Sequence, residues 1–235
     1  MAASRFTRLY RKLLEKRLRP AGFTETHGYH WRERDRIVHV IALDRSRASD
    51  FTGLFAAMPL VCPEDHFSFG FGGGVHELGP QPHGNWPTPD PQDSEQIARV
   101  VGGYAQALER YVLPWLDRFS RPIDLVRADQ ANTWGLRRPS LGFAQVGRKN
   151  LLLGICALSE GDMDSGRAYL ELALRAYTSK TYPPDPGWDH VRATIALCEY
   201  YLDCLRRSDL DAIRTRIADA ESSTRRALGL PPREV

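Results

Sequence analysis

The stretch Gly28–Asp44, GYHWRERDRIVHVIALD, decides the fold, because here the hydrophobic pattern takes a period of two. It predicts two strands joined around Glu33-Arg34-Asp35, a polar trio suited to a turn. In the second strand one face carries Ile37, His39, Ile41 and Leu43, and the other carries Val38, Val40 and Ala42.

The segment before this stretch has the period of a helix instead. Residues 4–19 place apolar side chains three and four apart, at Phe6, Leu9, Tyr10, Leu13, Leu14 and Leu18. Basic side chains fill the rest of the surface, and Pro20 with Gly22 ends the helix. This pattern predicts an amphipathic helix packed on a sheet, whose basic face either meets solvent or recognises an anionic partner.

Two more strands are expected after the opening stretch. FTGLFAAMPLVC, residues 51–62, is apolar on both faces and is typical of a central strand. HFSFGFGGGVHEL, residues 66–78, alternates bulky and small side chains and predicts a fourth strand. Its glycines lack the lysine and hydroxyl of a phosphate-binding loop, so we interpret them as allowing a bulge or a close backbone approach.

The proline-rich segment at residues 79–92, GPQPHGNWPTPDPQ, is interpreted as a linker or a surface loop. The chain beyond it has helical patterns, with Pro114 expected to kink or shorten the first helix. The predicted fold is α+β: an N-terminal helix on a four-stranded, mostly antiparallel sheet, followed by a helical half of antiparallel hairpins. The expected domains are residues 1–78 and 93–235, which either pack as one domain or stand apart.

Composition narrows the class of protein. Residues 1–47 carry twelve basic and five acidic side chains, whereas the remainder carries twenty and twenty-four. The first twenty residues have no uninterrupted apolar run, and no run of about eighteen apolar residues occurs anywhere. We therefore expect a cytoplasmic protein without a signal peptide or a membrane span. The four dispersed cysteines predict buried thiols.

Six of the seven histidines lie between His27 and His83, which raises the question of catalysis. A metal-dependent or Cys/His-dependent hydrolase would draw on Cys62, His66, His76 and His83. Their spacings fit no closed zinc site, and no orienting group accompanies the cysteine. The sequence therefore predicts no cofactor, no metal and no catalytic residue, and this hydrolase stays an alternative. The isolated His39 is interpreted as a satisfied core histidine, and the paired aspartates at 162/164 and 209/211 as helix caps.

Nucleic-acid binding is a second alternative. The basic N-terminal segment has Tyr29 and Trp31 interleaved with its arginines, a set that could neutralise phosphates and stack on bases. Against it, the chain has a net charge of only +3 and contains no known reading motif.

Two resemblances add to this interpretation. Residues 150–176 resemble a tetratricopeptide-type helical hairpin, with Gly154 and Gly166 at the small positions and Gly161-Asp162 at the turn. Residues 4 to about 120 resemble the bacterial domain-of-unknown-function family 4304 in the order FTRLYRKLLEKRLRPAGFTETHGYHWRE, IVHVIALDRSR, FTGLFAAMPLVC and ALERYVLPWLDRF. Asp44-Arg45-Ser46 replaces the Gln-x-Ser of that pattern. The resemblance implies no catalytic residues, and it implies an association with immunity or antitoxin partners of bacterial toxins.

The leading prediction is a non-enzymatic protein-binding module whose partner is a protein, such as a toxin. The partner is expected to meet the basic N-terminal layer or the proline-rich loop, through Trp86, His83, Arg32, Arg34 and Arg36. Trp86 is either the anchor of that contact or a lid folded onto the glycine-rich strand.

Overall fold

The computed structural model describes residues 5–44, 50–78, 86–87, 89–90, 92–136, 146–178 and 189–233. The chain divides into two compact units, each built from three segments. The sheet unit comprises Met1–Met58, Phe69–Ser120 and Trp134–Gly142, and the helical unit comprises Pro59–Ser68, Arg121–Thr133 and Phe143–Val235. This division differs from the expected boundary at residues 79–92, because a segment next to the central strand belongs with the helices.

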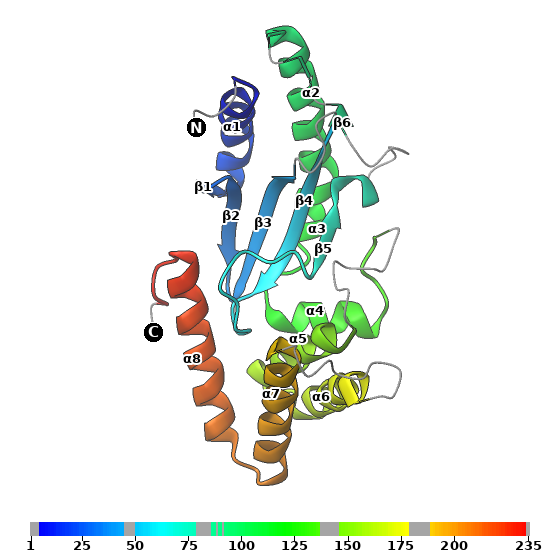
Figure 1. The fold of residues 1–235 in the computed structure, drawn as a ribbon, viewed down its shortest axis with the longest axis vertical. Helices are drawn as coiled ribbons and strands as arrows, with labels where there is room; N and C mark the ends of the chain where they lie inside the picture. Colours follow the sequence, from blue (N-terminus) through cyan, green and yellow to red (C-terminus); the bar gives the residue numbers. More distant parts are fainter. Residues whose placement is uncertain are drawn as a thin grey trace. The chain divides into compact units, whose positions relative to one another are not determined.

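The sheet unit contains an antiparallel sheet whose order follows the chain (Figure 1). Its path is β1 (Thr24–Thr26), β2 (Tyr29–Arg34), β3 (Ile37–Asp44), β4 (Asp50–Pro59) and β5 (Gly72–Gly74), and β6 (Trp86–Pro87) pairs with β4. The register sets His30 opposite Ile41 and Arg32 opposite His39. The α+β class and the central place of β4 are confirmed.

The prediction of four strands needs correction. Short strands β1 and β6 were not expected, and the strand expected over residues 66–78 is reduced to Gly72–Gly74 with a 3₁₀ turn at Val75–Glu77. A Cβ atom on Gly72 would lie 1.9 Å from the carbonyl oxygen of Phe55. The glycine therefore permits the close backbone approach that the sequence predicted.

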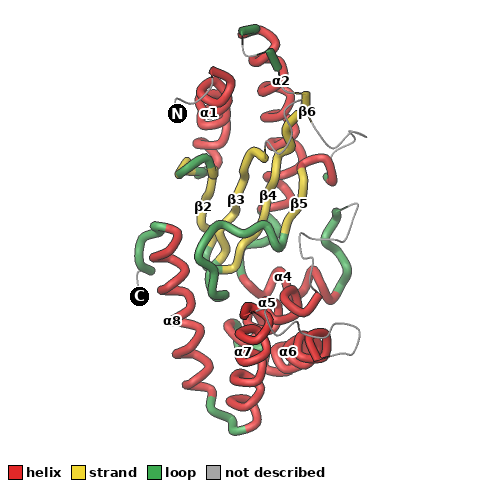
Figure 2. The backbone as a smooth tube through the Cα atoms, in the orientation of Figure 1, coloured by secondary structure: helices red, strands yellow, loops and turns green. Residues whose placement is uncertain are grey.

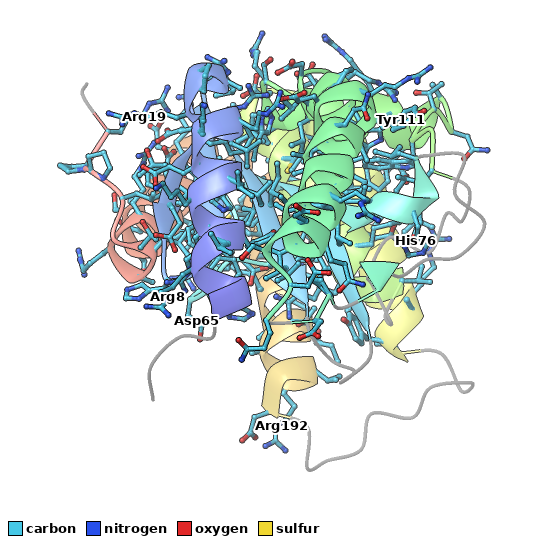
Figure 3. The ribbon with its side chains drawn as sticks, turned by 90° about the horizontal axis from the view of Figure 1, so that it is seen from above. Arg8, Arg19, Asp65, His76, Tyr111 and Arg192 are labelled. Atoms are coloured by element: carbon cyan, nitrogen blue, oxygen red, sulfur yellow. The ribbon has the colours of Figure 1, made fainter. Side chains whose placement is uncertain are left out.

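Two helices of the sheet unit lie side by side, with strands behind them (Figure 3). They are α1 (Arg5–Leu18), which continues into a 3₁₀ turn at Arg19–Ala21, and α2 (Ser94–Ala107). A π-helical segment, Leu108–Val112, follows α2 and leads into α3 (Leu113–Leu116). Pro114 has no N–H for the carbonyl of Arg110, which accounts for the expected irregularity at this end.

Aromatic side chains join these helices to the sheet. The ring of Tyr104 in α2 occupies the space over Gly53 of β4, where a Cβ atom would lie 2.2 Å from it. Tyr104 also lies 5.9 Å from the ring of Tyr10 in α1. Phe55 meets Trp115 edge to face at 4.9 Å between ring centroids. The core of the sheet unit is therefore completed by residues beyond 92, and α2 belongs with the sheet.

The helical unit consists of α4 (Pro122–Gln130), α5 (Val146–Ser159), α6 (Met163–Thr178), α7 (Asp189–Arg206) and α8 (Leu210–Leu228), as Figure 2 shows in red. These are the helices that the sequence predicted. Gly161 adopts a left-handed φ of 83° in the turn between α5 and α6. The aspartates begin helices as expected, since Asp162 Oδ1 accepts from the N–H of Ser165 and Asp209 Oδ1 from that of Ala212.

The segment Pro59–Ser68 is fixed to this unit by residues far along the chain. The hydroxyl of Thr224 in α8 donates to the carbonyl of Cys62 at 2.9 Å and accepts from the N–H of Glu64 at 3.1 Å. The carboxylate of Glu64 binds Arg148 of α5 through both oxygens, at 2.8 and 2.9 Å. This segment is thus part of the packing of the helical unit.

Candidate binding site between the first two helices

The apolar stripe of α1 is wider than its contact with the core of the sheet unit. Tyr10, Leu14 and Leu18 are buried, whereas Leu9 and Leu13 are only half-buried. At about 100° per residue, Leu9 and Leu18 lie about 180° apart around the helix, more than a single packed face requires. Leu9 and Leu13 therefore leave an apolar strip along one flank of α1.

That strip forms one side of a groove of about 520 Å³ between α1 and α2. From α2 the groove is lined by Ser94, Ile97 and Ala98. Ile97 is fully buried and forms part of the floor. The remaining lining residues are basic, namely Arg8, Lys12 and Lys16 of α1. We name the set Arg8, Leu9, Lys12, Leu13, Lys16, Ser94, Ile97 and Ala98 the basic groove.

The basic side chains on the rim of the groove differ in their ion pairing from other basic side chains of α1. Arg11 pairs with Glu25 of β1 at 3.8 Å, and Arg17 pairs with Glu109 of the π-helical segment at 3.4 Å. Arg8, Lys12 and Lys16 are exposed, and within the described part of the chain they make no ion pair. Their charge is therefore available to an external anionic group.

A second depression, of about 450 Å³, extends this surface toward the end of α1. It is lined by Lys12, Glu15, Lys16, Arg19 and Pro20, so the two hollows share Lys12 and Lys16. Figure 3 labels Arg8 and Arg19 near the two ends of this basic face. Glu15 is the single acidic residue of α1.

The end of α1 is fixed by a left-handed turn. Gly22 has a φ of 85° and donates to the carbonyl of Arg19, and the N–H of Phe23 donates to the carbonyl of Leu18. This pair of bonds is the Schellman arrangement that satisfies carbonyls at a helix end. Phe23 is buried, with the guanidinium of Arg32 lying 4.7 Å from its ring centroid. The sequence predicted this stop from Pro20 and Gly22.

Arg32, one of the expected contact residues, is turned inward and is 5% exposed. Its Nε donates to Nδ1 of His39 at 3.0 Å, one Nη donates to the carbonyl of Ala21 at 2.9 Å, and the other binds the Asp117 carboxylate. The guanidinium thus joins the end of α1, strand β3 and the turn after α3. Its side chain is used within the chain, so we leave Arg32 out of any contact surface.

His39 is fully buried beside Arg32. Its Nδ1 accepts from Arg32, so Nε2 carries the proton and donates to the carbonyl of Phe119 at 2.7 Å. Burial is the main cause that lowers the pKa of His39 from 6.5 to about 4, and the positive charge of Arg32 contributes to this shift. The interpretation of His39 as a satisfied core histidine is confirmed.

The other expected contact residues are spread over the sheet unit. Arg34 is exposed at the end of β2, and Arg36 is half-buried in the following turn. The backbone of Trp86, in β6, pairs with Phe51 of β4. The side chain of Trp86 and the whole of His83 lie outside the described residues. Neither Arg34 nor Arg36 lines the basic groove.

Among the described residues of the hydrolase alternative, Cys62 and His66 make no hydrogen bond to each other. Cys62 is fully buried, its Sγ lies 3.7 Å from the carbonyl of Leu152, and burial raises the pKa of its thiol well above the ordinary value. A nucleophilic cysteine needs the opposite shift and access to substrate. His66 is exposed and faces Asp65 at 2.5 Å, while His76 belongs to the sheet unit.

The aromatic residues of the nucleic-acid alternative, Tyr29 and Trp31, make contacts within the chain. The ring of Tyr29 stacks on Phe69 at 6.3 Å between centroids, and Nε1 of Trp31 donates to the hydroxyl of Thr26 at 3.1 Å. Both side chains are half-buried. Base stacking requires an open aromatic face, so these contacts reduce the support for that alternative.

The described ranges, residues 5–233 with their gaps, contain no group of three histidine, cysteine, aspartate or glutamate side chains arranged to hold a metal ion. None of their helices combines the length and the hydropathy needed to cross a membrane.

Sequence reasoning identified the basic face of α1 but missed the groove, because Ile97 comes from a helix more than eighty residues away. The available signal was the excess width of the apolar stripe, carried by Leu9 and Leu13. In comparisons with known proteins, no family model, no curated protein and no solved structure matches this chain.

Proposed function

We propose that the chain is a cytoplasmic, non-enzymatic binding module that recognises an acidic protein through the basic groove. The observation that carries this proposal is the combination of an apolar floor with an unpaired basic rim. Leu9, Leu13 and Ile97 line the groove, while Lys12 and Lys16 stand beside them without an ion pair among the described residues. Protein interfaces combine an apolar centre and a polar rim in this way.

A protein partner accounts for both parts of the groove. Apolar surface at Leu9 and Leu13 gains free energy only when another apolar surface covers it. Lysines on the rim then favour acidic partners and raise the association rate at low salt. A nucleic-acid backbone would use the lysines but leave the leucines uncovered. The groove therefore supports protein recognition better than phosphate recognition.

Affinity capture with a matched pair of variants tests the proposal. The full chain, the variant Lys12→Glu/Lys16→Glu and the control variant Arg167→Glu/Arg226→Glu are each immobilised and exposed to lysate of the cell that encodes the protein. Both variants change the net charge equally, and Arg167 and Arg226 are exposed residues outside the groove. We expect one acidic protein, in stoichiometric amount, that the wild type and the control retain and the groove variant loses. Equal retention by all three proteins, or no retained protein, would contradict the proposal.

In its narrower form the proposal is that this partner is a bacterial toxin, as the resemblance to family 4304 implies. The captured protein should then arrest growth when expressed alone and be harmless when co-expressed with the wild-type chain. Protection should fail with Lys12→Glu/Lys16→Glu. A captured protein that has no effect on growth would leave the proposed binding function in place and contradict the proposal that the partner is a toxin.

A further inference from the structure

We infer that the partner docks on the basic groove with an amphipathic α-helix whose carboxylates lie one turn apart. This inference rests on the proposed function and specifies the structure that the groove receives. The inference rests on the observation that both sides of the groove are helices, α1 and α2, whose side chains are spaced by helical turns.

The backbone of the partner sets the first constraint. The groove is lined by side chains of two helices whose N–H and C=O groups bond along their own axes, so it offers no strand edge to an extended peptide. Backbone groups pressed onto Leu9, Leu13 and Ile97 must be satisfied within the partner, because an unpaired buried amide is costly. A helix satisfies its own backbone and meets this constraint.

The spacing of the groove residues sets the second constraint. Leu9 and Leu13 are four residues apart on α1, and so are Lys12 and Lys16, which gives each pair a rise of about 6 Å. A helix lying along the groove repeats its own side chains with that same rise. Carboxylates at positions i and i+4 can therefore face Lys12 and Lys16 while apolar residues on the adjoining face cover the leucines.

A membrane surface fits the observations less well. An amphipathic helix that binds lipid inserts its apolar face, and the apolar face of α1 is occupied by its own unit through Tyr10, Leu14 and Leu18. Only the strip of Leu9 and Leu13 remains, and it faces α2 across the groove. The shape of the groove therefore favours a single helix over the flat surface of a membrane.

Fluorescence anisotropy with three synthetic probes tests the inference on the full chain. The first probe is a helix of roughly 18 residues, about five turns, with one leucine stripe flanked by glutamates at i and i+4. The second has the same composition with the leucines distributed around the helix, and the third has glutamine in place of glutamate. We expect the first probe to bind at least about tenfold more tightly than either of the others.

The protein variants locate the binding. Lys12→Glu/Lys16→Glu should weaken binding of the first probe by about tenfold or more, whereas Arg167→Glu/Arg226→Glu should leave it nearly unchanged. Circular dichroism melting of each variant checks that its fold is retained, which is expected because all four residues are exposed. Crosslinking from a photoreactive residue at Ala98 should label the first probe.

Other outcomes would overturn the inference without removing the proposed function. Equal affinity for the amphipathic and the redistributed probe would show that no helical face is recognised. Preferential binding of phosphatidylserine-containing vesicles or of duplex DNA over the first probe would assign the lysines to another partner and, unlike the other outcomes, would contradict the proposed function as well. A captured acidic protein that depends on Lys12 and Lys16 but crosslinks through a non-helical segment would keep the function and contradict the helix.

Discussion

Arg32 and Arg34 show how two neighbouring basic residues of one strand acquire different roles. Both were expected at a contact surface, because sequence shows only that they are basic and lie in a basic segment. In β2 they are two residues apart and so point to the same face of the sheet. Arg32 meets His39, Ala21 and Asp117, whereas Arg34 reaches solvent at the end of the strand.

This difference predicts opposite results from one type of substitution. Arg32→Ala removes three hydrogen bonds and leaves the buried Nδ1 of His39 without its donor, so it should lower the free energy of unfolding by about 2–4 kcal/mol. Arg34→Ala should change it by less than about 0.5 kcal/mol. Urea denaturation of both variants measures the two effects. A small loss for Arg32→Ala would mean that the guanidinium is not a structural link.

His39 makes stability depend on pH in a defined direction. Its pKa is about 4 in the folded chain and 6.5 when unfolded, so between these values the unfolded state binds the extra proton. Stability should therefore be complete above pH 6.5 and fall as the pH drops toward 4, by about 3 kcal/mol in all. The charged groups that act on it are Arg32 and Arg34, which lower its pKa, and Asp117, which raises it. Urea midpoints measured across this range give the curve.

A pair of variants separates His39 from other groups, because burial also lowers the pKa of His30. His39→Gln should flatten the dependence between pH 6.5 and 4, and His66→Gln, at an exposed site, should leave it unchanged. A wild-type slope that survives in His39→Gln would assign the dependence to another group.

At the scale of elements, two glycines in helices should respond oppositely to alanine. A Cβ atom on Gly166 in α6 would lie 2.5 Å from Cδ2 of Leu158, so Gly166→Ala forces α5 and α6 apart and should cost about 1–3 kcal/mol. Gly102 in α2 is exposed and a Cβ atom there meets nothing within 4 Å. Gly102→Ala should stabilise the helix by about 0.5–1 kcal/mol.

Thermal unfolding followed by circular dichroism measures both glycine variants. Stabilisation by Gly166→Ala would show that the hairpin has room for a methyl group and that the small residue is not needed for close approach.

The elements that the sequence predicted well are those whose pattern is local. The helices from α4 to α8 follow from apolar spacing and from the caps at Asp162 and Asp209. The strand expected over residues 66–78 was too long, because alternating phenylalanines indicate a backbone conformation and do not specify a pairing partner. Only Gly72–Gly74 pairs with β4, while Pro59–Ser68 joins the helical unit.

For the candidate site, the sequence supplied the basic face and the structure supplied the groove. Lys12 and Lys16 were recognisable from the charge of the first helix. Ile97 was not, because contacts between residues so far apart depend on which helices become neighbours. The same reason hid the link between Arg32 and Asp117, which are 85 positions apart.

At the scale of the whole molecule, the composition of the sheet unit predicts which fragments fold. A fragment of residues 1–92 contains the sheet but lacks Tyr104, Trp115 and Phe119, all of which are buried against it. It should remain largely unfolded, whereas residues 1–142 should form the sheet core. Proton–nitrogen correlation spectra of the two fragments test this, and well-dispersed signals from residues 1–92 would restore the expected boundary.

The placement of Pro59–Ser68 in the helical unit has a consequence for synthesis on the ribosome. The N–H of Glu64 donates its hydrogen bond to the hydroxyl of Thr224, which is 160 residues later in the chain. At about 5–20 residues per second, roughly 8–32 s pass between the appearance of the two residues. During that interval the apolar side chains of Leu60, Val61 and Cys62, which are buried in the folded chain, have been synthesised but α8 is not yet complete. A nascent-chain chaperone would find its binding site in this segment. A translational pause before α8 would prolong the exposure of the segment.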